Sequence, residues 1–345
     1  MSLADHHRWL NRFVWFTAAA TLFLICSGGM VTSKGVGLAV PDWPTTFGYN
    51  MFLFPVSKWV GGIFFEHTHR LIASVVGFLT IILAVWLWRA EPRRWVRNLG
   101  WIALAVVVLQ GVLGGLRVTL LKDQIGIFHA CLAQAFFGLL VVIGIVTSGT
   151  WTALGQPNQI VSSRVARIAL ITGLAVYLQL ALGATVRHQH RDLSILDFPT
   201  SYGQWIPDIS PAAIAKINAW RDTQALSDVN AFQIWLQMAH RFGAILVAIG
   251  AIAVWSKVRG SERKAHPLLV LSNLLIVLVI CQITLGAWTI WSNKAADIAT
   301  AHVAVGATIF AVTISICVLG YRLAWHPPVV RPRTESVSSS VAVAS

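Results

Sequence analysis

Four histidines are the side chains in this sequence whose type and placement best suit chemistry. His69 and His129 lie in the first half of the chain, and His240 and His302 lie at corresponding places in the second half, each within an apolar segment. Ionisable side chains in such segments are rare and usually functional, because hydrocarbon does not stabilise charge. Two imidazoles that face each other from different helices are the axial ligands of six-coordinate haem iron. The sequence therefore predicts two bis-histidine haem sites.

Other roles for these histidines fit the pattern less well. A single histidine in a membrane helix commonly forms a hydrogen bond between helices, but two pairs repeated at one depth favour haem. The four cysteines form no CxxC or CxxCH motif, so neither a zinc ribbon nor a covalently attached haem is indicated. His67 has Met238 at its repeat position, which assigns the ligand role to His69. The remaining histidines lie at or beyond the ends of the apolar segments and are expected to be solvated: His6, His7, His188, His190, His266 and His326.

The histidines belong to an internal repeat. An Asp-aromatic-Pro-Thr-Thr/Ser-aromatic-Gly motif occurs twice, at residues 42–48 and 155 residues later at 197–203. Gly28 matches Gly183 at the same offset. Further matches keep the order at offsets of 171 to 173: His69-Arg70 with His240-Arg241, Gln110 with Gln282, Gly114 with Gly286, and His129 with His302. One chance match between apolar helices is common, but an ordered set indicates duplication. The fifth connection, 188–229, carries about 16 extra residues, holds residues 207–220, and could include a surface helix over the second site.

The elements that position the histidines are membrane spans. Hydrophobic residues make up 56% of the chain and charged residues 11%. Apolar runs long enough to cross a bilayer must be helical, because lipid cannot satisfy an open backbone. We predict eight spans, at residues 13–32, 62–88, 98–119, 125–148, 165–187, 230–255, 266–290 and 297–322. The expected fold is an all-α membrane protein of two tandem, parallel four-helix bundles, at 13–148 and 165–324.

The net charge of +13 has the distribution of a membrane protein and not of a nucleic-acid-binding protein. Its Arg and Lys clusters precede the first span, follow the last, and fill the second, fourth and sixth connections, all on one side of eight spans. By the positive-inside rule both termini are cytoplasmic, and we expect a multi-pass protein of the cell inner (plasma) membrane. Residues 1–12 are then a cytoplasmic N-terminus, 149–164 a cytoplasmic linker, and 325–345 a disordered tail.

The two units differ beside the predicted ligands. Glu66 precedes His69 by one helical turn, and its repeat counterpart is Gln237, which cannot ionise. A carboxyl group beside only one of the two haems suits a role in proton transfer. The alternative is a structural role, in which Glu66 forms a hydrogen bond with the loop backbone or an ion pair with Arg70. Arg70 and Arg241 each follow a histidine; they could pair with haem propionates or extend to the lipid headgroups.

These motifs resemble those of the haem A synthase family. The resemblance is carried by residues in the order of the chain: Gly28-Gly29, Pro41-Asp42-Trp43-Pro44, Glu66-His67-Thr68-His69-Arg70, Gln110-Gly111 with Gly114-Gly115, His129, Ala239-His240-Arg241 and His302. It covers nearly all of residues 13–322. Two departures are Lys34, near the place where many relatives have an arginine, and the absence of a cysteine pair from the first loop.

The resemblance implies a reaction and its participants. Haem O, the substrate, would be held by His69 and His129, and haem B, a redox cofactor, by His240 and His302. The methyl group at porphyrin position 8 would be oxidised to a formyl group by successive hydroxylations, with Glu66 as the family's acidic residue. Haem O synthase, terminal oxidase assembly and an electron partner of unknown identity are the implied partners.

Two other functions remain compatible with paired histidines. A dihaem electron-transfer protein would hold two haems without substrate chemistry, and Glu66 opposite Gln237 disfavours it mildly. A haem carrier or chaperone would hold an exchangeable haem and oxidise nothing. Identification of the haems extracted from expressing membranes distinguishes the three.

Overall fold

The computed structural model describes residues 3–154, 163–189, 193–261 and 266–324. The predicted tail, the middle of the predicted linker, His190 and His326 lie outside these residues, as do the side chains of His6 and His266. The described elements are helical, without a strand: α1 (Leu3–Ser33), η1 (Met51–Leu53), η2 (Val56–Lys58), α2 (Gly61–Ala90), α3 (Arg94–Leu120), α4 (Asp123–Val146), α5 (Gly149–Ala153), α6 (Ser163–Gln189), α7 (Pro211–Thr223), α8 (Ala231–Arg259), α9 (His266–Trp291) and α10 (Ala296–Ala324).

Among the described residues, eight helices are long and apolar enough to cross a membrane, and they coincide with the eight predicted spans. The all-α membrane fold is therefore confirmed. The largest difference in bounds is at the N-terminus, where α1 begins at Leu3 and not near residue 13. Its first turns are polar, so hydrophobicity alone places the start of the span too late.

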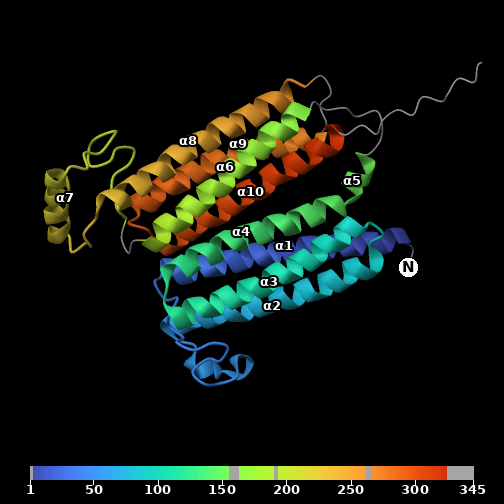
Figure 1. Cartoon of the computed structure of the whole chain (residues 1–345), viewed down its shortest axis with the longest axis horizontal. Coiled ribbons are helices and arrows are strands. Elements are labelled where there is room, and N and C mark those ends of the chain that lie inside the picture. Colours follow the sequence, from blue (N-terminus) through green and yellow to red (C-terminus); the bar gives the residue numbers. More distant parts are fainter. Residues whose placement is uncertain (1–2, 155–162, 190–192, 262–265, 325–345) are drawn as a thin grey trace, which may run out of the picture.

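The eight long helices pack as two groups of four (Figure 1). Helices α1 to α4 contact one another in a ring, and α6, α8, α9 and α10 form a second ring. The groups meet where α4 and α1 contact α10, and where α4 contacts α6. Small residues permit this approach: a Cβ atom added at Gly138 of α4 would lie 2.9 Å from the Phe310 ring of α10. At the contact between α4 and α6, the Tyr177 hydroxyl donates to the Cys131 carbonyl at 3.2 Å.

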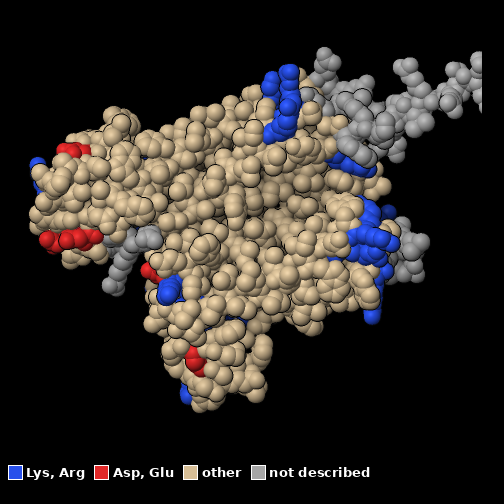
Figure 2. Space-filling view, in the orientation of Figure 1, with Lys and Arg blue, Asp and Glu red and all other residues tan. Residues whose placement is uncertain are grey.

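The two ends of the molecule differ. One end, which we call the loop end, carries the connections at residues 34–60 and 193–230; the other, the terminus end, holds the start of α1 and the end of α10 (Figure 1). On the face shown in Figure 2, Lys and Arg side chains gather at the terminus end. The prediction that both termini are cytoplasmic depends on this distribution.

The repeated motif folds the same way in both loops. The carboxylate of each motif aspartate, Asp42 or Asp197, accepts hydrogen bonds from the threonine hydroxyl three residues later and from the backbone N–H groups five and six residues later, at 2.5 to 3.0 Å. The residues that follow turn with matching positive φ angles, 51° at Phe47 and 53° at Tyr202. Burial raises the pKa of each aspartate, but these hydrogen bonds stabilise the carboxylate and hold its pKa below the ordinary value.

The extra residues of the fifth connection form α7, which confirms the predicted surface helix. Ser210 caps it by accepting from the Ala213 N–H, and a proline begins its first turn. At its end Arg221 is fully buried and donates to the carbonyls of Leu193 and Ser227. Through the buried Arg221, α7 is therefore hydrogen-bonded to both the beginning and the end of the second loop.

Replacement of Asp197 by asparagine should destabilise the loop in a pH-dependent way. Folding lowers the pKa of the Asp197 carboxylate. The stabilisation that this carboxylate gives to the folded protein is therefore complete above its pKa in the unfolded chain, about 4, and is lost as the pH falls through its lower pKa in the folded protein. We expect Asp197→Asn to lower the free energy of unfolding by about 1–3 kcal/mol at pH 7, and by much less at pH 2.5. Thermal unfolding in detergent at pH 7 and at pH 2.5 measures the two losses. Substitution of an exposed aspartate, Asp222→Asn, is the control. An equal loss at both pH values would contradict this account.

Candidate functional site

The four predicted ligands lie at matching depths in the membrane helices. His69 is in the third turn of α2 and His240 in the third turn of α8, while His129 and His302 are in the second turns of α4 and α10. All four helices begin at the loop end, so both pairs lie near that end (Figure 1). Each pair comes from two helices of one four-helix group.

The second pair has the separation expected of two ligands to one metal atom. The ring centroids of His240 and His302 are 6.4 Å apart, with the ring planes at 68°. An imidazole nitrogen lies about 2 Å from a bound metal, which sets the centroids of two opposing rings about 6 Å apart. His69 and His129 lie within electrostatic range of each other. The described residues contain no cluster of three or more His, Cys, Asp or Glu side chains placed to hold a metal ion.

A glycine on a neighbouring helix faces each of the four histidines. A Cβ atom added at any of these glycines would lie 2.9 to 3.5 Å from the Cε1 atom of the imidazole opposite. The four contacts are Gly28 with His69, Gly114 with His129, Gly183 with His240, and Gly286 with His302. The repeat matches found in the sequence are thus the residues that let the Cε1 edge of each ring approach a neighbouring backbone, inside its bundle.

Glutamine side chains on neighbouring helices contact three of the four histidines. Gln110 donates to the His129 carbonyl at 3.1 Å, and its counterpart Gln282 has its amide nitrogen 3.4 Å from Nε2 of His302. Gln179 donates to the His240 carbonyl at 2.7 Å, and its amide nitrogen is 3.1 Å from Nδ1 of that ring. Sequence reasoning missed Gln179, because the repeat places an apolar residue, Leu24, at its counterpart position.

Several imidazole nitrogens lack partners. The Nδ1 atoms of His69, His129 and His302 are buried without a hydrogen bond to any described residue. Buried polar atoms are normally paired, so rings held this way are typical of a site that receives a ligand. With imidazole pairs that face inward, a glycine close to each ring and a metal-compatible separation in the second pair, the residues present fit haem.

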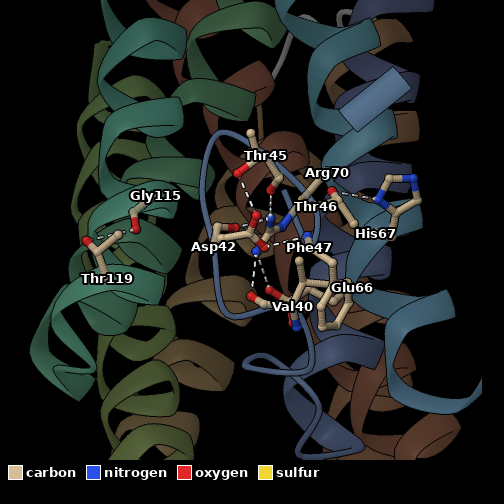
Figure 3. A network of polar contacts seen from close by, with 10 residues as sticks. All are labelled: Val40, Asp42, Thr45, Thr46, Phe47, Glu66, His67, Arg70, Gly115 and Thr119. Carbon is tan, nitrogen blue, oxygen red and sulfur yellow. Dashed lines mark hydrogen bonds and ion pairs between the residues drawn. The ribbon is translucent and has the colours of Figure 1, made fainter. Parts of the chain in front are cut away.

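Glu66 and Gln237 hold equivalent loop residues by different means. The Val40 N–H donates to Glu66 Oε2 at 2.9 Å, and the Val40 carbonyl accepts from Arg70 at 2.9 Å (Figure 3). Arg70 also forms an ion pair with Glu66 at 2.8 Å. In the second unit Gln237 alone satisfies both backbone groups of Ile195, each at 2.9 Å. A neutral amide therefore occupies the structural position that an acid and an arginine fill in the first unit.

Both arginines that follow a histidine bind the loops. Arg70 donates to the carbonyls of Asp42 and Thr45, at 2.7 and 3.1 Å. Arg241 donates to the equivalent carbonyls of Asp197 and Thr200, at 2.6 and 2.8 Å. The sequence suggested haem propionates or lipid headgroups as their partners, whereas the structure places both guanidinium groups among backbone carbonyls.

His67 and Lys34 lie beside the first loop. His67 is buried, with Nδ1 3.2 Å from the Thr46 hydroxyl (Figure 3), and its ring packs against Phe54 and Trp59. The Lys34 ammonium group lies 4.8 Å above the Phe65 ring. Both side chains therefore contact the loop and its adjoining helix.

The expectation that His188 is solvated is wrong. Helix α6 continues to Gln189, so His188 is still helical and its ring packs against Gly126 of α4 in the other bundle. Arg187, beside it, donates to the Gly29 carbonyl and the Ser33 hydroxyl of α1. Sequence analysis had no signal for these contacts, because neither residue has a charged counterpart in the first unit.

Comparison with known proteins shows the family of this chain. Residues 49–314 match the model of the family described as Cytochrome oxidase assembly protein, COX15-CtaA. A protein named Heme A synthase from Shouchella clausii is 27% identical over 84% of this chain and 89% of its own length. Proteins of the same name from Halalkalibacterium halodurans and Shewanella oneidensis are 30% and 25% identical, covering 59% and 92% of this chain and 68% and 96% of their own lengths. The chain belongs to the COX15-CtaA family of cytochrome oxidase assembly proteins.

Proposed function

We propose that this protein is a haem A synthase, an oxidoreductase that converts the C8 methyl group of haem O to a formyl group by successive hydroxylations. The observation that carries the proposal is the duplicated pair of inward-facing histidines in a member of the COX15-CtaA family. The names of the relatives support the same reaction. Haem O synthase, as the source of substrate, and terminal oxidase assembly, as the destination of product, are the partners that fit it.

The two units would have different roles, one binding the substrate and the other the cofactor. His69 and His129 would hold the substrate haem O, while His240 and His302 would hold haem B, which supplies redox chemistry when bound. The ring separation of 6.4 Å in the second pair supports a permanently bound haem there. The ionisable Glu66 supports substrate chemistry in the first unit, because a stable redox centre needs no proton acceptor beside it.

We also propose that Glu66 accepts a proton during the oxidation. Its carboxylate is fixed at two points, by the Val40 N–H and by Arg70, one turn before His69. Gln237 demonstrates that an amide can occupy the equivalent place and still hold the loop. Exchange of Glu66 for glutamine therefore separates proton chemistry from loop positioning.

The protein would lie in the cell inner (plasma) membrane with the terminus end in the cytoplasm. The basic side chains gathered at that end support this orientation (Figure 2). Both haem sites then lie toward the outer surface, beneath the loops at 34–60 and 193–230.

The reaction is tested by analysis of extracted pigments. Membranes that contain this protein together with a haem O-producing farnesyltransferase should yield a formylated haem, identified by chromatography and mass. The matched control is the His69→Ala protein, which should yield haem O but no formylated product. Haem B and haem O alone, from membranes with the wild-type protein, would refute the oxidation and favour an electron-transfer protein or a haem carrier.

Glu66→Gln should remove activity without removing haem. General acid–base catalysis contributes about 10²- to 10⁴-fold to a rate, so we expect formyl haem production to fall by at least about 100-fold while both haems stay bound. Glu91→Gln is the control, because Glu91 forms an ion pair with Arg93 at the terminus end, far from the histidines. Unchanged turnover in Glu66→Gln protein would leave Glu66 with only its loop-holding role.

The cofactor site should depend on His302 and on the glycine that faces it. We expect His302→Ala and Gly286→Leu to abolish the absorption spectrum of the tightly bound haem B, the first by loss of a ligand and the second by displacement of the ring. His129→Ala, in the first unit, should retain that spectrum. Retention of bound haem B in both second-unit variants would overturn the assignment of this site.

A further inference from the structure

We propose that Arg117, aided by Arg187 and His188, binds the propionate carboxylates of the haem held by His69 and His129. The inference rests on the proposed function in one respect, that the first histidine pair holds a haem. It does not require that this haem be oxidised.

The three side chains come together at the loop end. Arg117 lies in the last turn of α3, and Arg187 and His188 lie in the last turn of α6. Arg117 and His188 meet over Gly126 of α4: a Cβ atom added there would lie 3.2 Å from Nε of Arg117 and 2.8 Å from Cε1 of His188. Gly126 precedes His129 by three residues, so it lies on the same helical face about one turn closer to the loop end.

This position is directly beside the first histidine pair. Arg117 lies within electrostatic range of both His69 and His129. A haem bound between these two rings would carry its two carboxylates at one edge. Burying a carboxylate is costly, so this edge would face the polar loop end of the bundle. Arg117 and Arg187 lie at the loop end.

The positive charge of this group is not neutralised by ion pairs within the described residues. The two ion pairs found there join Arg70 with Glu66 and Arg93 with Glu91, and neither includes Arg117 or Arg187. Glu66 and Asp123 act on Arg117 only at longer range. A partly buried guanidinium group without a counter-ion is unfavourable, and a bound carboxylate would offset that cost with a bidentate hydrogen bond.

Comparison of the units indicates the same assignment. The repeat places Thr289 opposite Arg117, so the second unit lacks an arginine at that position, while Arg187 and His188 of α6 have the uncharged Thr32 and Ser33 as their counterparts in the first unit. Arg70 and Arg241 already donate to loop carbonyls in the two units, and Arg187 donates to the Gly29 carbonyl and the Ser33 hydroxyl of α1, which leaves Arg117 as the principal partner for a carboxylate. Arg117 thus has no counterpart in the second unit, whereas Arg187 lies between the units, within electrostatic range of Arg117 and of His302. A guanidinium group at the position of Arg117 would distinguish a haem with free propionates from an uncharged porphyrin.

The test compares haem O with its dimethyl ester, in which both carboxylates are blocked. Detergent-purified protein that retains haem in the second unit is titrated with each compound, and binding is followed by the absorption change of the first unit. Loss of a charge-assisted hydrogen bond weakens binding by about tenfold to a hundredfold. We expect the wild type to prefer the diacid by at least that factor, and Arg117→Gln to lose most of the preference while its affinity for the diester stays within about threefold.

Two further variants keep the test decisive. Arg259→Gln is the matched control, because Arg259 stacks on Trp255 at the terminus end, and it should retain the full preference. Arg117→Lys keeps the charge without the planar fork and should retain part of the preference. If Arg117→Gln also loses the second-unit haem, that variant is misfolded and the Arg117→Lys variant decides the question. A reduced preference for the diacid in Arg117→Lys supports the proposal, and a full preference overturns it.

The proposal is overturned if the wild type binds diacid and diester equally, or if Arg117→Gln and Arg117→Lys both keep the full preference. A full preference in these variants, together with less co-purified phosphatidylglycerol, would identify a lipid phosphate as the occupant of the group. Binding of the diacid through Arg117 without any formyl product would refute the proposed oxidation and leave this inference intact.

Discussion

The arrangement of this protein depends on helices that approach closely enough for a glycine to lie against an imidazole. Each of the four histidines has such a contact, and at three of the four glycines an added Cβ atom would fall within 3.1 Å of the ring. A larger residue would push the imidazole away or separate the helices. In a membrane, where apolar side chains gain little by leaving lipid for protein, small residues of this kind are a principal means of tight packing.

The loops depend on the same geometry. Because His69 and His240 face inward, the arginine one position later projects toward the loop end and reaches the carbonyls of the repeated motif. Within each motif one carboxylate accepts hydrogen bonds from two backbone N–H groups and a hydroxyl. Histidine, arginine and loop therefore act as one unit in each half, and any change in the rotation of α2 or α8 would disturb all three.

Within this shared frame, the two halves differ mainly in charge. The first has Glu66, Arg70 and Arg117 close to its histidine pair, whereas the second has Gln237 and Thr289 at the positions of the acid and of Arg117. Arg187 lies at the junction, within electrostatic range of Arg117 on one side and His302 on the other. Both sites therefore have arginines nearby, Arg70 and Arg117 in the first and Arg241 and Arg187 in the second, but only the first has an acidic side chain, Glu66, one helical turn from its histidine.

The sequence by itself determined the eight spans, the duplication and the depth of the four histidines. These follow from the length of apolar runs and from residue order, which are properties of the chain before it folds. Only the tertiary structure decided that Arg70 and Arg241 bind loop carbonyls, that Glu66 and Gln237 hold the same backbone position, and that Arg117 meets His188 over Gly126. Such contacts join residues on different helices, and they depend on how each helix is rotated about its axis. Packing against neighbouring helices sets that rotation, and an apolar sequence in a membrane, hydrophobic on every face, does not specify it.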